Sequence, residues 1–284
     1  MVPGCLVLGR LVFGSLVVGS LVCGPFPVAA QHRPLTVQDP EVIGQGRVLI
    51  EAGVESGTNV KYPVSGLTGD RWALPIGISI GVGPSVELQL DGGYQWLGID
   101  RRDLAPLDDR VAPGDSTSDV IDVIVGTKIR LLTEGRRRPA IGLRLATELP
   151  NASNESGLGR DTLNFSASLL LGKTLGSTRI AANGGVILLS DVLQGSLQQD
   201  AFVGGVSVTR ALNPTLDVAG EFAGRRVLFA DVPPIGAEPR AQLRGAIRYT
   251  RGAWRADGGL IVGATRQDPD VGLIFGVTWV IDRR

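Results

Sequence analysis

The residues best suited to chemistry in this sequence are charged side chains that recur at every second position within otherwise apolar segments. Alternate residues of a strand point to opposite faces, so these charges share one face and leave the other face apolar. We therefore expect the charged face to line the interior of the fold. The principal candidates are Glu51, Glu87, Asp91, Lys128, Arg130, Arg144, Arg244, Arg248 and Arg255.

Several other kinds of chemistry are disfavoured by residue type. The only histidine of the 284 residues is His32, and both cysteines, Cys5 and Cys23, lie within the first 30 residues. A histidine-based triad, a multi-histidine metal site or a thiol site in the folded body is therefore not expected. The Gly172-Lys173-Thr174 sequence imitates a phosphate loop but falls in a strand pattern, where that motif does not work. We expect no enzyme activity, no metal and no cofactor.

The first 30 residues have the layout of a cleaved signal peptide. Arg10 is the only charged residue before His32, the apolar run 11–24 follows, and Val28 and Ala30 provide small residues before Gln31. A membrane anchor is the alternative, but the run is short and rich in Gly. We predict export, with residues 31–45 as a periplasmic N-terminal segment and residues 46–284 as the folded body. The 28 basic and 28 acidic residues balance, which argues against nucleic-acid binding.

The folded body shows a period of two rather than the 3.6 of a helix. About twelve alternating segments follow one another, and long links such as 56–71 alternate with short ones. The expected strands are 48–54, 72–82, 86–96, 121–131, 141–149, 163–171, 180–188, 202–208, 216–222, 241–249, 254–262 and 271–281. This rhythm predicts an all-β, transmembrane antiparallel β-barrel with both termini and the short turns in the periplasm. A soluble β-sandwich is less favoured, because its polar face would meet bulk water, whereas the polar face here is largely Gly, Ala and Ser. A soluble twelve-strand sheet is less favoured because it would have two open edges.

Six aromatic residues fall on the apolar face near the ends of the expected strands. In a barrel of this kind they would form two sparse girdles at the membrane interfaces, where amphipathic rings are favoured. These residues are Trp72, Tyr94, Trp96, Tyr249, Trp254 and Trp279.

The middle of the chain resembles a known family. The strand Gly126-Thr127-Lys128-Ile129-Arg130 is similar to the family's Gly-x-Lys-Tyr-Arg strand, and Leu149-Pro150 is similar to the Leu-Pro that ends another of its strands. Further similar motifs occur at 118–120, 157–161, 173–176 and 182–185. Together they resemble the outer-membrane transporters named after the meta-pathway of phenol degradation. The resemblance implies a barrel that passes small, often hydrophobic molecules.

Two functional interpretations remain open at this stage. The first is a bacterial outer-membrane barrel that lets small molecules, including hydrophobic or aromatic ones, cross passively through a polar lumen. The second is a barrel with a plugged lumen, whose extracellular loops bind partners. In both cases the expected contacts are with outer-membrane lipid, and in the first also with small-molecule solutes.

The inward charges suggest one further expectation about the lumen. Glu87 and Asp91 share a face of the third strand, and Arg244 and Arg248 share a face of the tenth, which lies across the barrel. If the space between them is wet, these acidic and basic columns would impose a transverse field on solutes. If it is dry, the charges must find partners. We also expect a new Arg at position 87 to be tolerated better than one at Leu88.

Overall fold

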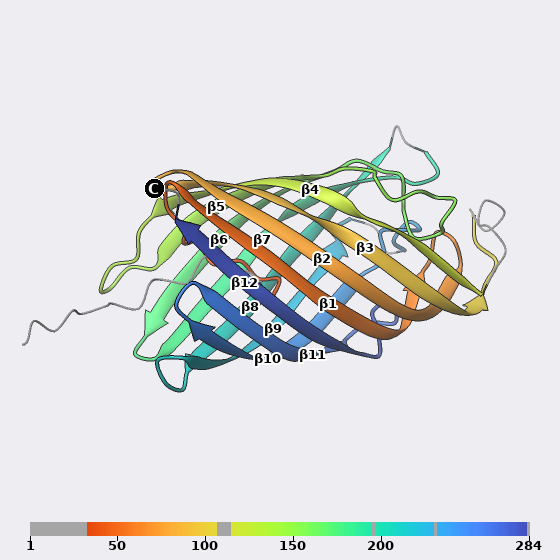
Figure 1. The fold of residues 1–284 in the computed structure, drawn as a ribbon. Helices are drawn as coiled ribbons and strands as arrows, with labels where there is room; N and C mark the ends of the chain where they lie inside the picture. Colours follow the sequence, from red (N-terminus) through yellow and green to blue (C-terminus); the bar gives the residue numbers. More distant parts are fainter. Residues whose placement is uncertain (1–32, 107–114, 195–196, 230–231, 283–284) are drawn as a thin grey trace, which may run out of the picture.

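The computed structural model describes residues 33–106, 115–194, 197–229 and 232–282 as a closed antiparallel barrel (Figure 1). Each strand pairs with its sequence neighbours, and β1 closes the barrel against β12. The strands are β1 (Arg47–Tyr62), β2 (Leu67–Gly83), β3 (Val86–Arg102), β4 (Ser116–Leu132), β5 (Ala140–Glu148), β6 (Asn164–Leu175), β7 (Thr178–Ser190), β8 (Gln198–Ala211), β9 (Leu216–Val227), β10 (Arg240–Arg251), β11 (Trp254–Gly263) and β12 (Val271–Asp282). The predicted all-β, twelve-strand antiparallel barrel is confirmed, and the expected signal peptide, residues 1–30, lies outside the described residues.

The closing seam is continuous and leaves no free strand edge along its length. The pairing of β1 with β12 runs without interruption from Arg47 opposite Asp282 to Gly57 opposite Gly272. Closure satisfies the backbone groups that an open sheet would expose at its edges. Within the described residues, no helix is long and apolar enough to cross a membrane.

Each strand separates an apolar outer face from a largely polar inner face. On β3, Leu88 is 46% exposed, whereas its neighbours Glu87 and Gln89 are buried. The same alternation continues along β12, where Phe275 and Val277 are exposed and Ile274 and Thr278 are buried. The period of two in the sequence therefore corresponds to the two faces of the barrel wall.

The links at the two ends of the barrel differ in length, as expected, but the first strands are longer than predicted. The link expected over residues 56–71 shrinks to residues 63–66, because β1 continues to Tyr62 and β2 begins at Leu67. A register shift between Gly57 and Val60, with Asn59 at a positive φ of 55°, interrupts the alternation there. Pairing continues beyond this bulge, where the sequence no longer alternates.

Residues 33–46 lie inside the barrel. We expected residues 31–45 to form a periplasmic segment ahead of the wall, but the described part bonds to inward side chains of β1, β3, β4, β7, β9, β10 and β11. Inward glycines allow this close approach: a Cβ on Gly81 would lie only 1.7 Å from the carbonyl oxygen of Gly44. Polar wall groups that are removed from water need partners, and the backbone of this segment supplies them. We name residues 33–46 the inner segment.

Candidate functional site

One buried ion pair in the lumen wall joins two neighbouring strands. Glu87 of β3 lies opposite Lys128 of β4 in the register, and both side chains are fully buried with 3.0 Å between Nζ and Oε1. The other oxygen of Glu87 accepts a hydrogen bond of 2.8 Å from the backbone N–H of Ile43. The pair thus neutralises itself in the wall and at the same time holds the inner segment.

A second buried pair joins the seam strand to β11. The Arg255 guanidinium lies 3.5 Å from the Glu51 carboxylate, which also accepts a hydrogen bond from the Thr278 hydroxyl. Arg255 donates to the carbonyl oxygen of Arg33 at 2.6 Å. This pair again ties wall and inner segment together.

The acidic and basic columns expected to face each other across the lumen are paired more locally. Arg248 forms an ion pair with Asp217 on the adjacent strand β9. Arg244 lies 3.8 Å from Glu55 of β1 and donates to the carbonyl oxygen of Pro34. The remaining predicted residues also have partners of opposite charge: Arg144 lies 3.9 Å from Asp91, and Arg130 lies 2.7 Å from Glu41. Local pairing removes most of the transverse field that separated columns would produce.

Glu221 on β9 holds the middle of the inner segment through several hydrogen bonds. Its carboxylate accepts hydrogen bonds from the backbone N–H of Thr36 at 2.9 Å, from that of Val37 at 2.6 Å and from the Thr36 hydroxyl. Asn183 of β7 accepts from the N–H of Gln38 and donates to its carbonyl. Hydrogen bonds that involve a charged acceptor are stronger than neutral ones, so Glu221 fixes the middle of the inner segment.

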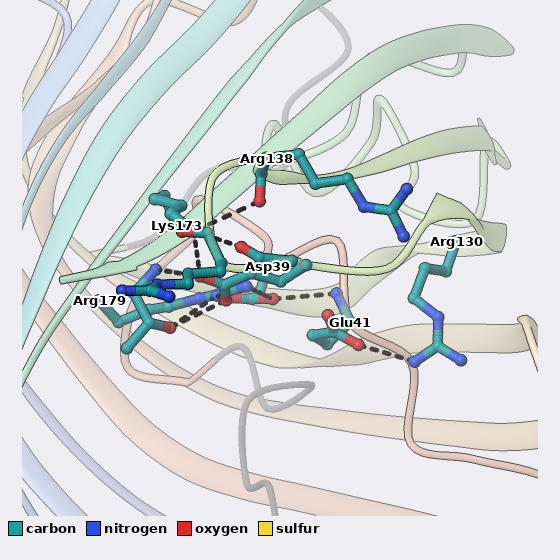
Figure 2. A network of polar contacts seen from close by, with 10 residues as sticks. Asp39, Glu41, Arg130, Arg138, Lys173 and Arg179 are labelled. Carbon is teal, nitrogen blue, oxygen red and sulfur yellow. Dashed lines mark hydrogen bonds and ion pairs between the residues drawn. The ribbon is translucent and has the colours of Figure 1, made fainter. Parts of the chain in front are cut away.

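A polar network fastens the inner segment at the end that carries the short turns (Figure 2). Asp39 receives two hydrogen bonds from Arg179 of β7, at 2.7 and 2.8 Å. Glu134, in the turn between β4 and β5, also pairs with Arg179 and lies 3.1 Å from the Lys173 ammonium. Burial raises the pKa of Glu134, but hydrogen bonds from Thr174 and Lys173 and the Arg179 charge outweigh it and lower that pKa to about 2.

A cavity of about 580 Å³ lies inside the barrel beside the inner segment. Thr36, Val37 and Gln38 line one part of it, while Val64 and Leu158 come from the links between strands at the end with the longer loops. Its charged lining residues are Asp122, Arg144, Glu148, Arg160, Arg225, Glu238, Arg240 and Asp268. A second cavity of about 270 Å³ lies between Glu55, Arg71 and Arg244. The lumen therefore holds open space next to the inner segment, lined by both charged and apolar side chains.

The six predicted girdle residues lie on the outer face in two groups. Trp72 is the register partner of Trp96, and the Tyr94 and Trp96 rings meet edge to face at 4.7 Å. Trp254 and Trp279 stack with ring centroids 4.9 Å apart. The first group lies toward the longer loops, and the second, with Tyr249, lies beside the short turn that precedes β11. Their role at the membrane interfaces stays a prediction.

Sequence reasoning missed the inner segment and therefore Asp39 and Glu41. One signal was available: Leu35, Val37, Val42 and Ile43 are apolar although their segment has no strand or helix period. All four are buried in the structure. Within the described residues, no group of three His, Cys, Asp or Glu side chains converges as a metal site.

Comparison with solved structures identifies the fold. An outer-membrane channel of the COG4313 group from Pseudomonas putida F1 matches with a TM-score of 0.59 at 13% identity, covering 86% of this chain and 98% of that one. The NanC porin matches with a TM-score of 0.52 at 8% identity, over 82% and 98% of the two chains. The chain has the fold of outer-membrane channels. No protein-family model matches the sequence, and no curated protein does.

Proposed function

We propose that this protein is a bacterial outer-membrane channel through which small molecules cross passively. The observation that carries the proposal is a closed barrel with an apolar outer face and, inside it, a cavity of about 580 Å³ lined by both apolar and charged side chains. A cavity of this size suits molecules of drug-like dimensions or smaller. The family resemblance in residues 118–190 extends the proposal to hydrophobic or aromatic solutes.

In this proposal the wall charges prepare the path without reacting with the solute. Pairs such as Glu87 with Lys128 and Glu51 with Arg255 are neutral overall, so they do not hold a passing ion tightly. The inner segment narrows the lumen, and solute passes where cavities remain beside it. Conduction requires binding that is weak enough for release, and a path of paired charges provides it. We propose no catalytic step.

Location and sidedness belong to the same proposal. A cleaved signal peptide over residues 1–30 would deliver the chain to the periplasm, from which the barrel inserts into the outer membrane. The short turns and both termini would face the periplasm, and the longer loops the outside. The protein should then fractionate with outer membranes and migrate differently in gels before and after heating.

A plugged barrel is the second candidate, because the inner segment contacts seven of the twelve strands. Single-channel recording in planar bilayers separates the two. We expect discrete conductance steps from the purified, heat-modifiable protein. Folded protein that inserts but never conducts would contradict the channel and favour the plugged barrel.

A further inference from the structure

Two arginines lie directly opposite each other in the lumen wall. Arg225 of β9 and Arg240 of β10 are register partners, and both line the cavity of about 580 Å³. Like charges placed opposite each other on neighbouring strands are destabilising. Within the described residues neither arginine has a carboxylate at ion-pair distance, so no direct ion pair offsets this repulsion.

A third arginine converges on the same place. Arg160, from the loop between β5 and β6, donates to the carbonyl oxygen of Gly236 at 3.0 Å. Arg225 donates to that same oxygen at 3.3 Å. Two guanidinium groups thus meet at one carbonyl oxygen, which carries only a partial negative charge. We name Arg160, Arg225 and Arg240 the arginine cluster.

The cluster retains donors that the chain does not use. A guanidinium has five N–H donors. Among the described residues, Arg240 gives one hydrogen bond, to the carbonyl oxygen of Lys61, and Arg225 gives the one to Gly236. The Nε of Arg225 is buried and has no hydrogen-bond partner in the part of the chain that the structure describes. A buried unsatisfied donor is costly, and a ligand oxygen would satisfy it.

The acidic residues around the cavity leave the donors of Arg225 and Arg240 unpaired, although Glu148 pairs with Arg160 of the cluster. Glu148 accepts from Asn164 at 2.8 Å and lies 3.4 Å from Arg160. Asp268 holds the N–H of Ala241 and the Thr265 hydroxyl, and Asp122 holds two backbone N–H groups of the loop after β5. Glu238 also lines the cavity, but it forms no ion pair with the cluster among the described residues.

We infer that the arginine cluster is a binding site for the carboxylate of a small organic acid that passes through the lumen. Arginine recognises carboxylates through paired N–H donors, and a bound anion would offset the repulsion between Arg225 and Arg240. Val64, Leu158 and Leu170 line the same cavity and would contact the apolar body of the acid. The inference rests on the proposed channel and names a class of solute for it.

The test uses benzoate, with benzamide as a neutral molecule of nearly the same shape. Binding is measured by calorimetry at low salt on the full protein in lipid nanodiscs, so it does not depend on conduction. We expect benzoate to bind at least tenfold more tightly than benzamide. Arg225→Gln/Arg240→Gln should weaken benzoate binding at least tenfold and leave benzamide unchanged. Glu238→Gln should strengthen benzoate binding, because it removes a negative charge from the lining of the same cavity.

The control is Arg226→Gln, because Arg226 is one residue away on the outer face of β9. It should leave benzoate binding unchanged. Equal binding of benzoate and benzamide, or an equal loss in the Arg226 variant, would overturn the inference. If the double variant fails to fold, Arg240→Gln alone must still weaken benzoate binding. Conductance without benzoate binding would refute the site but not the channel, and binding without conductance would refute the channel alone.

Discussion

At the scale of single residues, the side of the wall decides what a substitution does. Leu88→Arg places a charge on the outer face, where Leu88 is 46% exposed. We expect a loss of about 1 kcal/mol in the free energy of unfolding, because Leu88 lies only two residues after the start of β3 and the charge would meet lipid near the membrane interface. Urea titration of the barrel in vesicles measures this loss. Leu88→Met is the control, and an equal stability of the two variants would show that this face does not meet lipid.

For the neighbouring position, the structure replaces our expectation that Arg would be tolerated there. Glu87 is fully buried against Lys128, so a new Arg would meet a buried like charge. The milder change Glu87→Gln should already cost about 3–5 kcal/mol, because it leaves Lys128 charged and unpaired. In the same urea titration, Glu87→Gln/Lys128→Met should recover most of that loss. A double variant as unstable as the single one would contradict this account.

The alternation of residues along each strand predicted which charged side chains face the lumen, but not which of them form pairs. Glu87 and Lys128 are 41 positions apart in the sequence, and only the register of β3 against β4 places them opposite each other. Register depends on the lengths of turns and on bulges such as the one between Asp91 and Gly93. Such features leave little trace in a single sequence, so the expectation of opposed columns missed the local pairs.

At the scale of elements, the strands were predictable where one face meets an apolar surface. Where the strands extend past that apolar surface, both of their faces are polar. The C-terminal end of β3, with Asp100, Arg101 and Arg102, therefore shows no alternation. The inner segment was not predictable for a related reason. Its position depends on individual hydrogen bonds, such as those from Thr36 and Val37 to Glu221, rather than on a repeating pattern.

The inner segment should limit the conductance of the channel. Glu221→Ala removes the acceptor of the Thr36 and Val37 N–H groups and should free the middle of the segment. We expect larger or longer openings in single-channel recordings. Asp217→Ala is the matched control, since Asp217 lies on the same strand but pairs with Arg248 of the wall. Identical conductance in wild type and Glu221→Ala would mean that the segment does not obstruct the path.

The turn between β4 and β5 should be sensitive to acid. The folded pKa of Glu134, about 2, lies below its ordinary value of 4.5, so its ionised form stabilises the fold above that value. This stabilisation, about 1 kcal/mol after solvent screening, is lost as pH falls from about 4.5 toward 2. Wild type should therefore be more stable than Glu134→Gln at pH 7 and equal to it near pH 2, as measured by urea titration.

The control for this pH dependence is Glu155→Gln in the longer loop after β5. Glu155 forms no ion pair among the described residues, so its replacement should change stability little at either pH. A stability difference between wild type and Glu134→Gln that stays constant from pH 7 to pH 2 would contradict the role given to this turn.

At the scale of the whole molecule, closure of the barrel depends on the seam between β1 and β12. These strands lie at opposite ends of the described chain, so their pairing closes nearly the longest loop that the chain can form. The entropy lost in closing a loop rises only slowly with its length, whereas an open seam would leave two unpaired edges in lipid. Inside the barrel, the Arg33 backbone N–H donates to Glu51 of β1 and Arg255 donates to the Arg33 carbonyl oxygen, which reinforces the seam from within.

A disulfide across the seam tests this closure directly. Ala52 and Val277 are register partners on the outer face, and the chain from residue 31 onward contains no Cys. Directly opposed Cα atoms in an antiparallel pair lie within disulfide range, so Ala52→Cys/Val277→Cys should cross-link on mild oxidation. The joined chain should change the mobility of heated, non-reduced protein. Ala52→Cys/Phe275→Cys, which is displaced by two residues, should cross-link far less. Equal cross-linking of both pairs would mean that the seam slips, and a slipping seam would lose the fixed register on which the buried pairs of the lumen depend.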